Sequence, residues 1–193
     1  QANTHLQSDP ILRPVVESYT LPPLPVGRDP FTALLHSIVS QQLSTKAAAS
    51  ILRRFEDQIP HPCTADTILT VPLTTFRSIG LSARKATYCH NIANHWQQSP
   101  EFWQPIHELS DQHIIDELTK IKGVGVWTVQ MLLMFTLHRE DVFPLGDLAI
   151  RDAMSHLYNV DVSSKKNWST LTDIAQQWSP YRSVAARYLW RYR

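Results

Sequence analysis

The chain has 193 residues, of which 43% are hydrophobic and 18% charged, and its formal net charge is +1. This length is sufficient for one domain with a buried core or for two small lobes. The richest apolar stretch, Val124–Leu137, is shorter than a membrane-spanning helix and contains Thr128 and Gln130, so we expect no transmembrane segment. No basic stretch followed by an apolar run opens the chain, so we also expect no signal peptide.

Two cysteines, Cys63 and Cys89, are too few for a disulfide-rich secreted fold, a Cys₄ zinc site or a four-cysteine iron–sulfur cluster. We expect both to be buried thiols in a reducing, intracellular compartment. The net charge does not by itself indicate a nucleic-acid partner. Basic residues outnumber acidic ones by seven to four from Asp147 to Arg193, a modest excess that solvated helix faces would also explain.

Capping residues and apolar spacing predict helices along the whole chain. Asp29 followed by Pro30 marks one helix start, and Ser44, Ser82 and Ser110 mark others. The expected helices span about residues 9–19, 31–43, 45–55, 64–69, 72–79, 82–96, 111–120, 126–137, 148–157, 168–178 and 181–191. The helix over 126–137 is apolar on nearly all sides and is expected to be buried all round. No useful segment alternates with period two, so we predict an all-α fold.

The segment 118–130, LTKIKGVGVWTVQ, joins two predicted helices through a Gly-Val-Gly turn. The first amides of the second helix have no partner within it, and together with the helix dipole they form an anion site suited to a DNA backbone phosphate. Glycine permits the unusual φ of such a turn, and it lacks a Cβ that would keep a phosphate away. A packing hairpin without a ligand is the alternative, since Gly-x-Gly alone is a weak signal and the Gly-Lys-Ser/Thr of a Walker A loop is missing.

Farther along the chain, the segment 141–150, DVFPLGDLAI, places Asp147 where a helix should begin. A capping role is the ordinary explanation for such an aspartate. The helix dipole and amide hydrogen bonds at this position also favour the ionised carboxylate. Asp147 would therefore be a weak proton acceptor but a suitable fixed negative charge opposite a developing cation.

The segments IKGVGVWT (121–128) and DVFPLGDLAI resemble the helix-hairpin-helix DNA glycosylases, most closely the 3-methyladenine DNA glycosylase II branch that removes alkylated bases. The resemblance includes SIVSQQLSTKAA (37–48), GLSARKA (80–86) and WSPYRSVAARYLW (178–190), and it covers nearly the whole chain from Asp29 onward. It implies one unit, residues 1–193, built from two helical lobes with the active-site cleft between them. We expect residues 30–60 and 160–193 to form one lobe, and residues 61–159 to form the lobe with the hairpin and the catalytic aspartate.

The resemblance also implies roles for individual residues. It assigns catalysis to Asp147, the base pocket to Trp127, Met131 and Trp190, and DNA binding to Gln42, Leu43, Ser44, Lys122, Gly123, Gly125 and Thr128. Among these, Gln42 matches the wedge that fills the gap left by an extruded nucleotide. The main-chain carbonyls of Thr119, Ile121 and Val124 match positions that hold a monovalent cation, Na⁺ or K⁺, and no other cofactor is expected.

Trp127 stands where bifunctional members of this superfamily carry a nucleophilic lysine. The resemblance therefore implies a monofunctional enzyme that flips out purines of the 3-methyladenine and 7-methylguanine type, hydrolyses the N-glycosidic bond and leaves an abasic site. The expected partner is double-stranded DNA with alkylated bases. We expect the protein to act as a monomer and not to associate with a membrane. The expected location is the cytoplasm, at the nucleoid, in a bacterium or archaeon, and the nucleus in a eukaryote.

Three alternatives stay open at this point. The chain could recognise damaged DNA without turnover, or it could be a glycosylase for deaminated or oxidised bases. A metal hydrolase is less well supported, because His90 and His95 have no acidic pair nearby and are expected at the surface or at helix caps.

Overall fold

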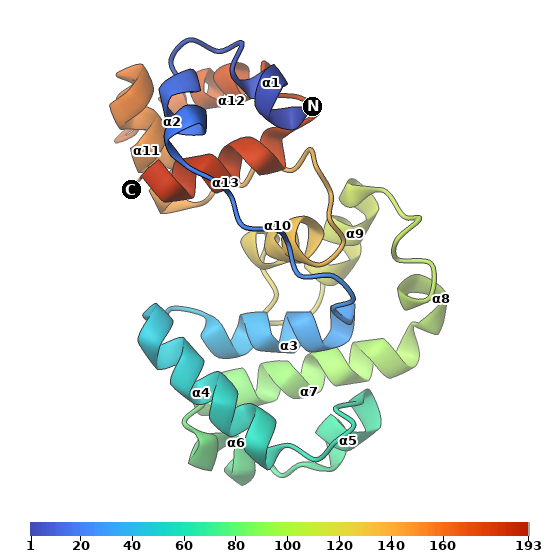
Figure 1. Ribbon diagram of the computed structural model, residues 1–193. Coiled ribbons are helices and arrows are strands. Elements are labelled where there is room, and N and C mark those ends of the chain that lie inside the picture. The colour runs from blue at the N-terminus through green and yellow to red at the C-terminus, as the bar shows by residue number, and fades with distance from the viewer. Residues whose placement is uncertain (193) are drawn as a thin grey trace. The chain divides into compact units, whose positions relative to one another are not determined.

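The computed structural model describes residues 1–192, except for the side chain of Thr45. These residues form thirteen α-helices and one short 3₁₀ helix, and none of them belongs to a strand. The predicted all-α class is confirmed (Figure 1). Within the same range, no helix is both long enough and apolar enough to span a bilayer.

The chain divides into two compact units. Residues 26–132 form the first, which we call the hairpin unit, and residues 1–25 with 133–193 form the second, the terminal unit. The predicted lobes were wrong in two respects, because residues 30–60 belong with the hairpin and Asp147 belongs with the C-terminal helix. The physical reason is the apolar face of the helix over 30–40, which packs on the helix over 83–98 instead of on the C-terminal segment.

The hairpin unit is built on two helices that lie side by side, α3 (Pro30–Ser40) and α7 (Ala83–Gln98) (Figure 1). The other complete helices of this unit are α4 (Thr45–Gln58), α5 (Ala65–Thr70), α6 (Leu73–Ile79), α8 (Pro100–Trp103) and α9 (Asp111–Leu118). The predicted caps Asp29, Ser44, Ser82 and Ser110 each accept a first-turn amide, as predicted. Gly80 ends α6 with φ +109°, in the left-handed conformation that glycine tolerates.

The terminal unit consists of α1 (Ala2–Leu6), α2 (Arg13–Ser18), α11 (Leu148–Tyr158), η1 (Lys165–Asn167), α12 (Trp168–Gln176) and α13 (Arg182–Tyr192). Its two chain segments are joined through Asp9, a buried residue that is 8% exposed. Asp9 accepts hydrogen bonds from the Tyr158 hydroxyl at 2.6 Å and the Trp178 indole at 2.9 Å. Burial alone would raise the pKa of Asp9, but these bonds and two main-chain amides outweigh it and lower the pKa.

Helix α10 (Val126–Phe135) begins in the hairpin unit, and its last three residues belong to the terminal unit. Val129, Leu133 and Met134 are buried, but Met131 is half-buried, Val126 is 51% exposed and Trp127 is 42% exposed. The prediction of burial on all sides was therefore wrong, most clearly for the first turn. Apolar residues exposed at the start of a helix are available for contact with a ligand.

The two cysteines differ in their surroundings. Cys89 is fully buried, and burial raises the pKa of its thiol to about 12, so it is an unreactive packing residue. Cys63 is only half-buried, contrary to the prediction of two buried thiols.

Candidate active-site carboxylate and DNA-binding hairpin

Asp147 is the N-cap of α11, and the donors to its carboxylate include two neutral groups. Oδ1 accepts the main-chain amide of Ile150 at 3.0 Å and the indole N–H of Trp190 at 3.1 Å. The same oxygen atom therefore caps α11 and contacts Trp190. The structure thus brings the predicted catalytic carboxylate and one predicted pocket aromatic into direct contact within the terminal unit.

A residue of α11 holds the turn that precedes Asp147. The guanidinium of Arg151, one turn into α11, donates to the carbonyl of Leu145 at 2.9 Å and lies 4.3 Å from the centre of the Trp168 ring. The amide of Asp147 donates to the Pro144 carbonyl at 2.9 Å. These contacts limit the freedom of the carboxylate before any ligand binds.

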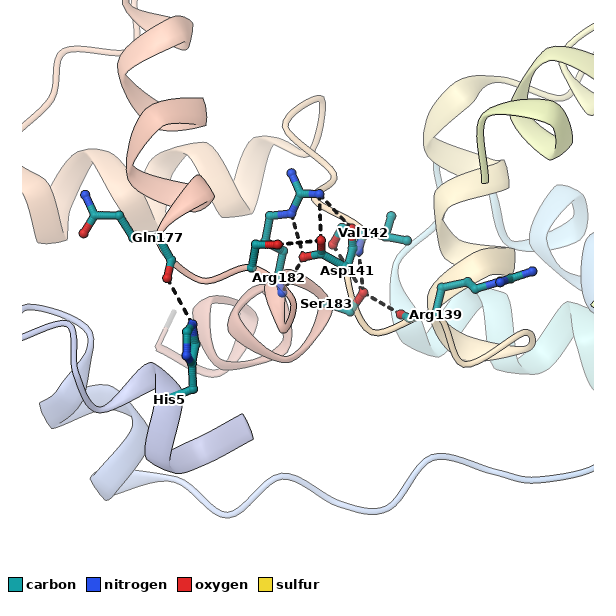
Figure 2. A network of polar contacts seen from close by, with 8 residues as sticks. His5, Arg139, Asp141, Val142, Gln177, Arg182 and Ser183 are labelled. Carbon is teal, nitrogen blue, oxygen red and sulfur yellow. Dashed lines mark hydrogen bonds and ion pairs between the residues drawn. The ribbon is translucent and has the colours of Figure 1, made fainter. Parts of the chain in front are cut away.

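A polar network joins the segment leading to Asp147 to the beginning of α13 (Figure 2). Asp141 accepts from Arg182 through Nε at 2.7 Å and Nη2 at 3.0 Å, and from the Ser179 hydroxyl at 2.8 Å. Although burial would raise the pKa of Asp141, the Arg182 and Ser179 contacts lower it. The Ser183 hydroxyl accepts the Val142 amide at 2.9 Å and donates to the Arg139 carbonyl at 2.6 Å.

This network connects two ends of the site, because α13 carries Trp190 in its last turn. Sequence reasoning missed the Asp141–Arg182 pair. Both residues lie inside motifs that carried the family resemblance, and their opposite charges were the available signal. Nothing in the spacing, however, indicated that one would pair with the other across forty residues of chain.

The other predicted pocket residues lie on α10. Trp127 is exposed, and Met131 follows one turn later and is half-buried. Trp190 is half-buried, and its ring centroid lies 5.8 Å from that of Phe135. A common base pocket for these three residues stays a prediction.

The hairpin turn runs from the end of α9 to the start of α10. The Ile121 amide donates to the Leu118 carbonyl at 3.1 Å, and the Val124 amide donates to the Ile121 carbonyl at 2.9 Å. A carbonyl oxygen has a second lone pair, so this bond leaves Ile121 able to contact a cation as well. The cation predicted at the carbonyls of Thr119, Ile121 and Val124 stays a prediction.

The two hairpin glycines serve different purposes. Gly123 has φ +109°, and a Cβ there would lie 2.2 Å from Cγ of Tyr88, so this glycine is required by the backbone and by a neighbouring ring. Gly125 is exposed, and a Cβ there would meet nothing within 4 Å. The expected unusual φ is confirmed for Gly123. The expectation that both glycines leave room for a phosphate stays a prediction, and Gly125 has open surroundings.

The polar residues of the hairpin are likewise distinct. Lys120 forms an ion pair with Glu117, whereas Lys122 has an exposed side chain, and the Lys122 carbonyl accepts from Asn91 at 3.1 Å. Thr128 is 3% exposed, and its hydroxyl accepts from the Gln41 side chain at 3.3 Å. The side chain of Thr128 therefore serves the packing of the hairpin unit, and the predicted DNA contact of this residue stays a prediction.

The predicted wedge lies in the loop between α3 and α4. Gln42, Leu43 and Ser44 are all exposed, and Gln42 adopts the left-handed conformation with φ +57°. The Ser44 hydroxyl accepts the Ala47 amide at 3.3 Å and so also caps α4.

The metal-hydrolase alternative gains no support. His90 and His95 are half-buried, not surface residues: His90 lies 3.0 Å from the Val71 carbonyl, and His95 accepts from Trp103 at 3.1 Å. Across the described part of the chain, no three His, Cys, Asp or Glu side chains gather as metal ligands would.

Similarity to known proteins identifies the family of this chain. The family model of the HhH-GPD superfamily base excision DNA repair proteins matches residues 35–178. DNA-3-methyladenine glycosylase 1 of Schizosaccharomyces pombe is 35% identical over 173 residues, which is 85% of this chain and 72% of that protein.

Two solved structures are similar over nearly the whole chain. The Schizosaccharomyces pombe 3-methyladenine DNA glycosylase in complex with abasic DNA has a TM-score of 0.86 at 31% identity, covering 98% of this chain and 95% of that one. The DNA-3-methyladenine glycosidase of Bacillus halodurans has a TM-score of 0.81 at 31% identity, covering 98% and 87%. The chain therefore belongs to the HhH-GPD superfamily of base excision DNA repair proteins.

Proposed function

We propose that this protein is a monofunctional DNA glycosylase of the 3-methyladenine DNA glycosylase II type, which removes alkylated purines from double-stranded DNA. The observation that carries the proposal is the Asp147 carboxylate, held at the N-terminus of α11 by Ile150 and Trp190. Similarity to proteins named 3-methyladenine glycosylases supports the choice of lesion.

The chemistry follows from the charge of the substrate. A purine methylated at N3 or N7 carries a positive charge, so its N-glycosidic bond breaks with both electrons going to the base, which leaves as a neutral molecule. The sugar becomes an oxocarbenium ion, and a fixed carboxylate at Asp147 stabilises it electrostatically. Water then bonds to C1′ of the sugar and releases one proton, which gives the abasic site.

The same charge favours aromatic recognition. The face of an indole ring attracts a cation, and stacking of a methylated purine on such a ring contributes about 0.5–2 kcal/mol. Trp190 combines that capacity with its hydrogen bond to Asp147. One residue would then contribute both to the recognition of the charged base and to the placement of the carboxylate.

DNA binding is assigned to the hairpin unit. The amides at the start of α10 would receive a backbone phosphate, with a Na⁺ or K⁺ ion at the neighbouring carbonyls and Lys122 adding positive charge. Gln42 would enter the duplex as the damaged nucleotide leaves it. The protein is proposed to do this as a monomer.

Strand cleavage is not part of the proposed activity. Lyase chemistry needs an amine that attacks the sugar and forms a Schiff base. Trp127 occupies the position where bifunctional relatives carry lysine. Of the two lysines just before the hairpin turn, Lys120 and Lys122, the first is paired with Glu117.

The test is to incubate the protein with methylated duplex DNA and to identify the released bases by chromatography. We expect 3-methyladenine and 7-methylguanine, with strands that break only after alkali and no adduct trapped by borohydride. Release of deaminated or oxidised bases instead would reassign the lesion, and tight binding without any release would indicate a recognition protein. A trapped covalent complex would contradict the monofunctional assignment.

A further inference from the structure

The loop that carries Gln42 needs outside support. Helix α3 ends at Ser40, Gln41 leaves the helical conformation with ψ 134°, and Gln42 is left-handed with φ +57°. A residue other than glycine pays a conformational cost in the left-handed region, so the surrounding contacts must hold it there. The exposed side chain of Gln42 does not provide them, and the support comes from its neighbours.

The first support is Lys85, on helix α7. Its ammonium nitrogen donates to the Val39 carbonyl at 2.8 Å and to the Gln41 carbonyl at 2.7 Å. A cation at the C-terminus of a helix satisfies carbonyls that have lost their helical partners and interacts favourably with the helix dipole. Lys85 therefore fixes the main chain on the residue directly before Gln42.

The second support is the side chain of Gln41 itself. Its amide nitrogen donates to the Gly123 carbonyl at 3.2 Å and to the Thr128 hydroxyl at 3.3 Å. Gly123 lies in the hairpin turn, and Thr128 lies in the first turn of α10. Gln41 thus attaches the loop to the hairpin, more than eighty residues away in sequence.

One face of helix α7 contacts both the loop that carries Gln42 and the hairpin turn. Lys85 holds the loop, Tyr88 lies against Gly123, and Asn91 donates to the Lys122 carbonyl at 3.1 Å. Residues three apart lie along one side of a helix. Helix α7 therefore contacts both the loop and the hairpin, which are also in direct contact through Gln41.

We propose that Gln41 and Lys85 are positioning residues that hold Gln42 at a fixed place relative to the hairpin. The proposal rests on the proposed function, in which the hairpin binds backbone phosphates and Gln42 fills the gap in the duplex. Under that function, the contacts of Gln41 and Lys85 determine where Gln42 enters relative to the bound phosphate. They affect extrusion of the base, and they leave phosphate binding and bond hydrolysis unchanged.

The test uses Gln41→Met, which keeps the side-chain length but removes the donor to Gly123. The matched control is Gln58→Met, at the exposed end of α4. The substrates carry 7-methylguanine opposite either cytosine or thymine, with 2-aminopurine as the neighbouring base, so that its fluorescence reports extrusion. Single-turnover base release, affinity for undamaged duplex and thermal stability are measured alongside.

We expect Gln41→Met to reduce both extrusion and base release by about tenfold when the lesion is paired with cytosine, as expected for a carbonyl left without its donor. The reduction should be about twofold or less opposite thymine, because a mismatched base is easier to extrude. Affinity for undamaged duplex should not change. Lys85→Met should act in the same direction, and Lys85→Arg, which keeps the donors, should restore most of the rate.

Equal slowing on both substrates together with lost affinity for undamaged DNA would overturn the proposal, since Gln41 would then only stabilise the hairpin. Unchanged extrusion in Gln41→Met would overturn it as well. If the wild-type protein extrudes the lesion but releases no base, the glycosylase assignment fails while the fluorescence comparison still decides the positioning role. If it gives neither a fluorescence change nor base release, both proposals fail, whereas base release without a fluorescence change overturns the positioning role alone.

Discussion

Replacement of Asp147 by asparagine separates its helix-capping role, which the structure shows, from its proposed role in electrostatic stabilisation. The Ile150 amide and the Trp190 indole bond to the same oxygen of the side chain, Oδ1. The amide oxygen of asparagine can accept both bonds, and asparagine caps helices about as well as aspartate. We therefore expect Asp147→Asn to fold normally, with a free energy of unfolding within about 0.5 kcal/mol of the wild type.

The loss of charge should appear in the rate. A carboxylate about 4 Å from a positive sugar contributes about 4 kcal/mol at the effective dielectric constant of a partly exposed site. Removal of one preorganised electrostatic group in enzymes costs about 10²–10³ in rate. We expect Asp147→Asn to slow base release at least about 100-fold, with affinity for undamaged duplex unchanged.

The assay is single-turnover release of 7-methylguanine from duplex DNA, with thermal unfolding measured on the same samples. Asp29→Asn is the matched control, because Asp29 caps α3 through the Thr32 amide at 2.8 Å in the same manner. Asp147→Ala should add a stability loss of about 1 kcal/mol, because it also removes the cap. Release at the wild-type rate by Asp147→Asn, or an equal loss in Asp29→Asn, would show that Asp147 is only a capping residue.

Three further expectations follow from particular contacts. Gly125→Val should weaken binding to damaged and undamaged duplexes alike and reduce the slope of log affinity against log salt by about one in a titration series, whereas Gly123→Val should lower the melting temperature. Trp190→Phe removes the indole donor to Asp147 and should slow base release about tenfold with little change in melting temperature; an unchanged rate would contradict a role for that bond. The depressed pKa of Asp9 means that its carboxylate stabilises the fold above its ordinary pKa and that this contribution is lost as pH falls through the lower, folded-state pKa. The stability deficit of Asp9→Asn, about 2 kcal/mol in urea unfolding at pH 7, should therefore shrink as the pH is lowered below about 4.

Local signals were sufficient to predict most of the helices. Caps such as Ser82 and Ser110 act within three residues, so their effect can be deduced from a short stretch of sequence. The short helices α1 and α8 were not predicted, because neither has enough turns to show an apolar period. The grouping of helices into units failed for a related reason: periodicity identifies which face of α3 is buried, but not which helix covers it.

The candidate site was predicted from a resemblance. The structure adds the tertiary contacts of each residue, which cannot be deduced from the residue type. Gly123 and Gly125 are the same residue two positions apart, yet one is required by Tyr88 and by its φ, and the other is not. Thr128 was grouped with DNA contacts, although its burial and its bond to Gln41 depend on a loop far away in sequence. Such distinctions come from tertiary contacts, which no local pattern encodes.

The two aspartates of DVFPLGDLAI, Asp141 and Asp147, also have partners that the sequence motif does not indicate. Asp141 meets the guanidinium of Arg182 in two hydrogen bonds, so its negative charge is compensated and serves to join α13 to the segment leading to the site. Oδ1 of Asp147 accepts the Ile150 amide and the Trp190 indole, which orient the carboxylate at the start of α11. The motif places both aspartates in one short segment, but their partners lie on α11 and α13, which the motif alone could not show.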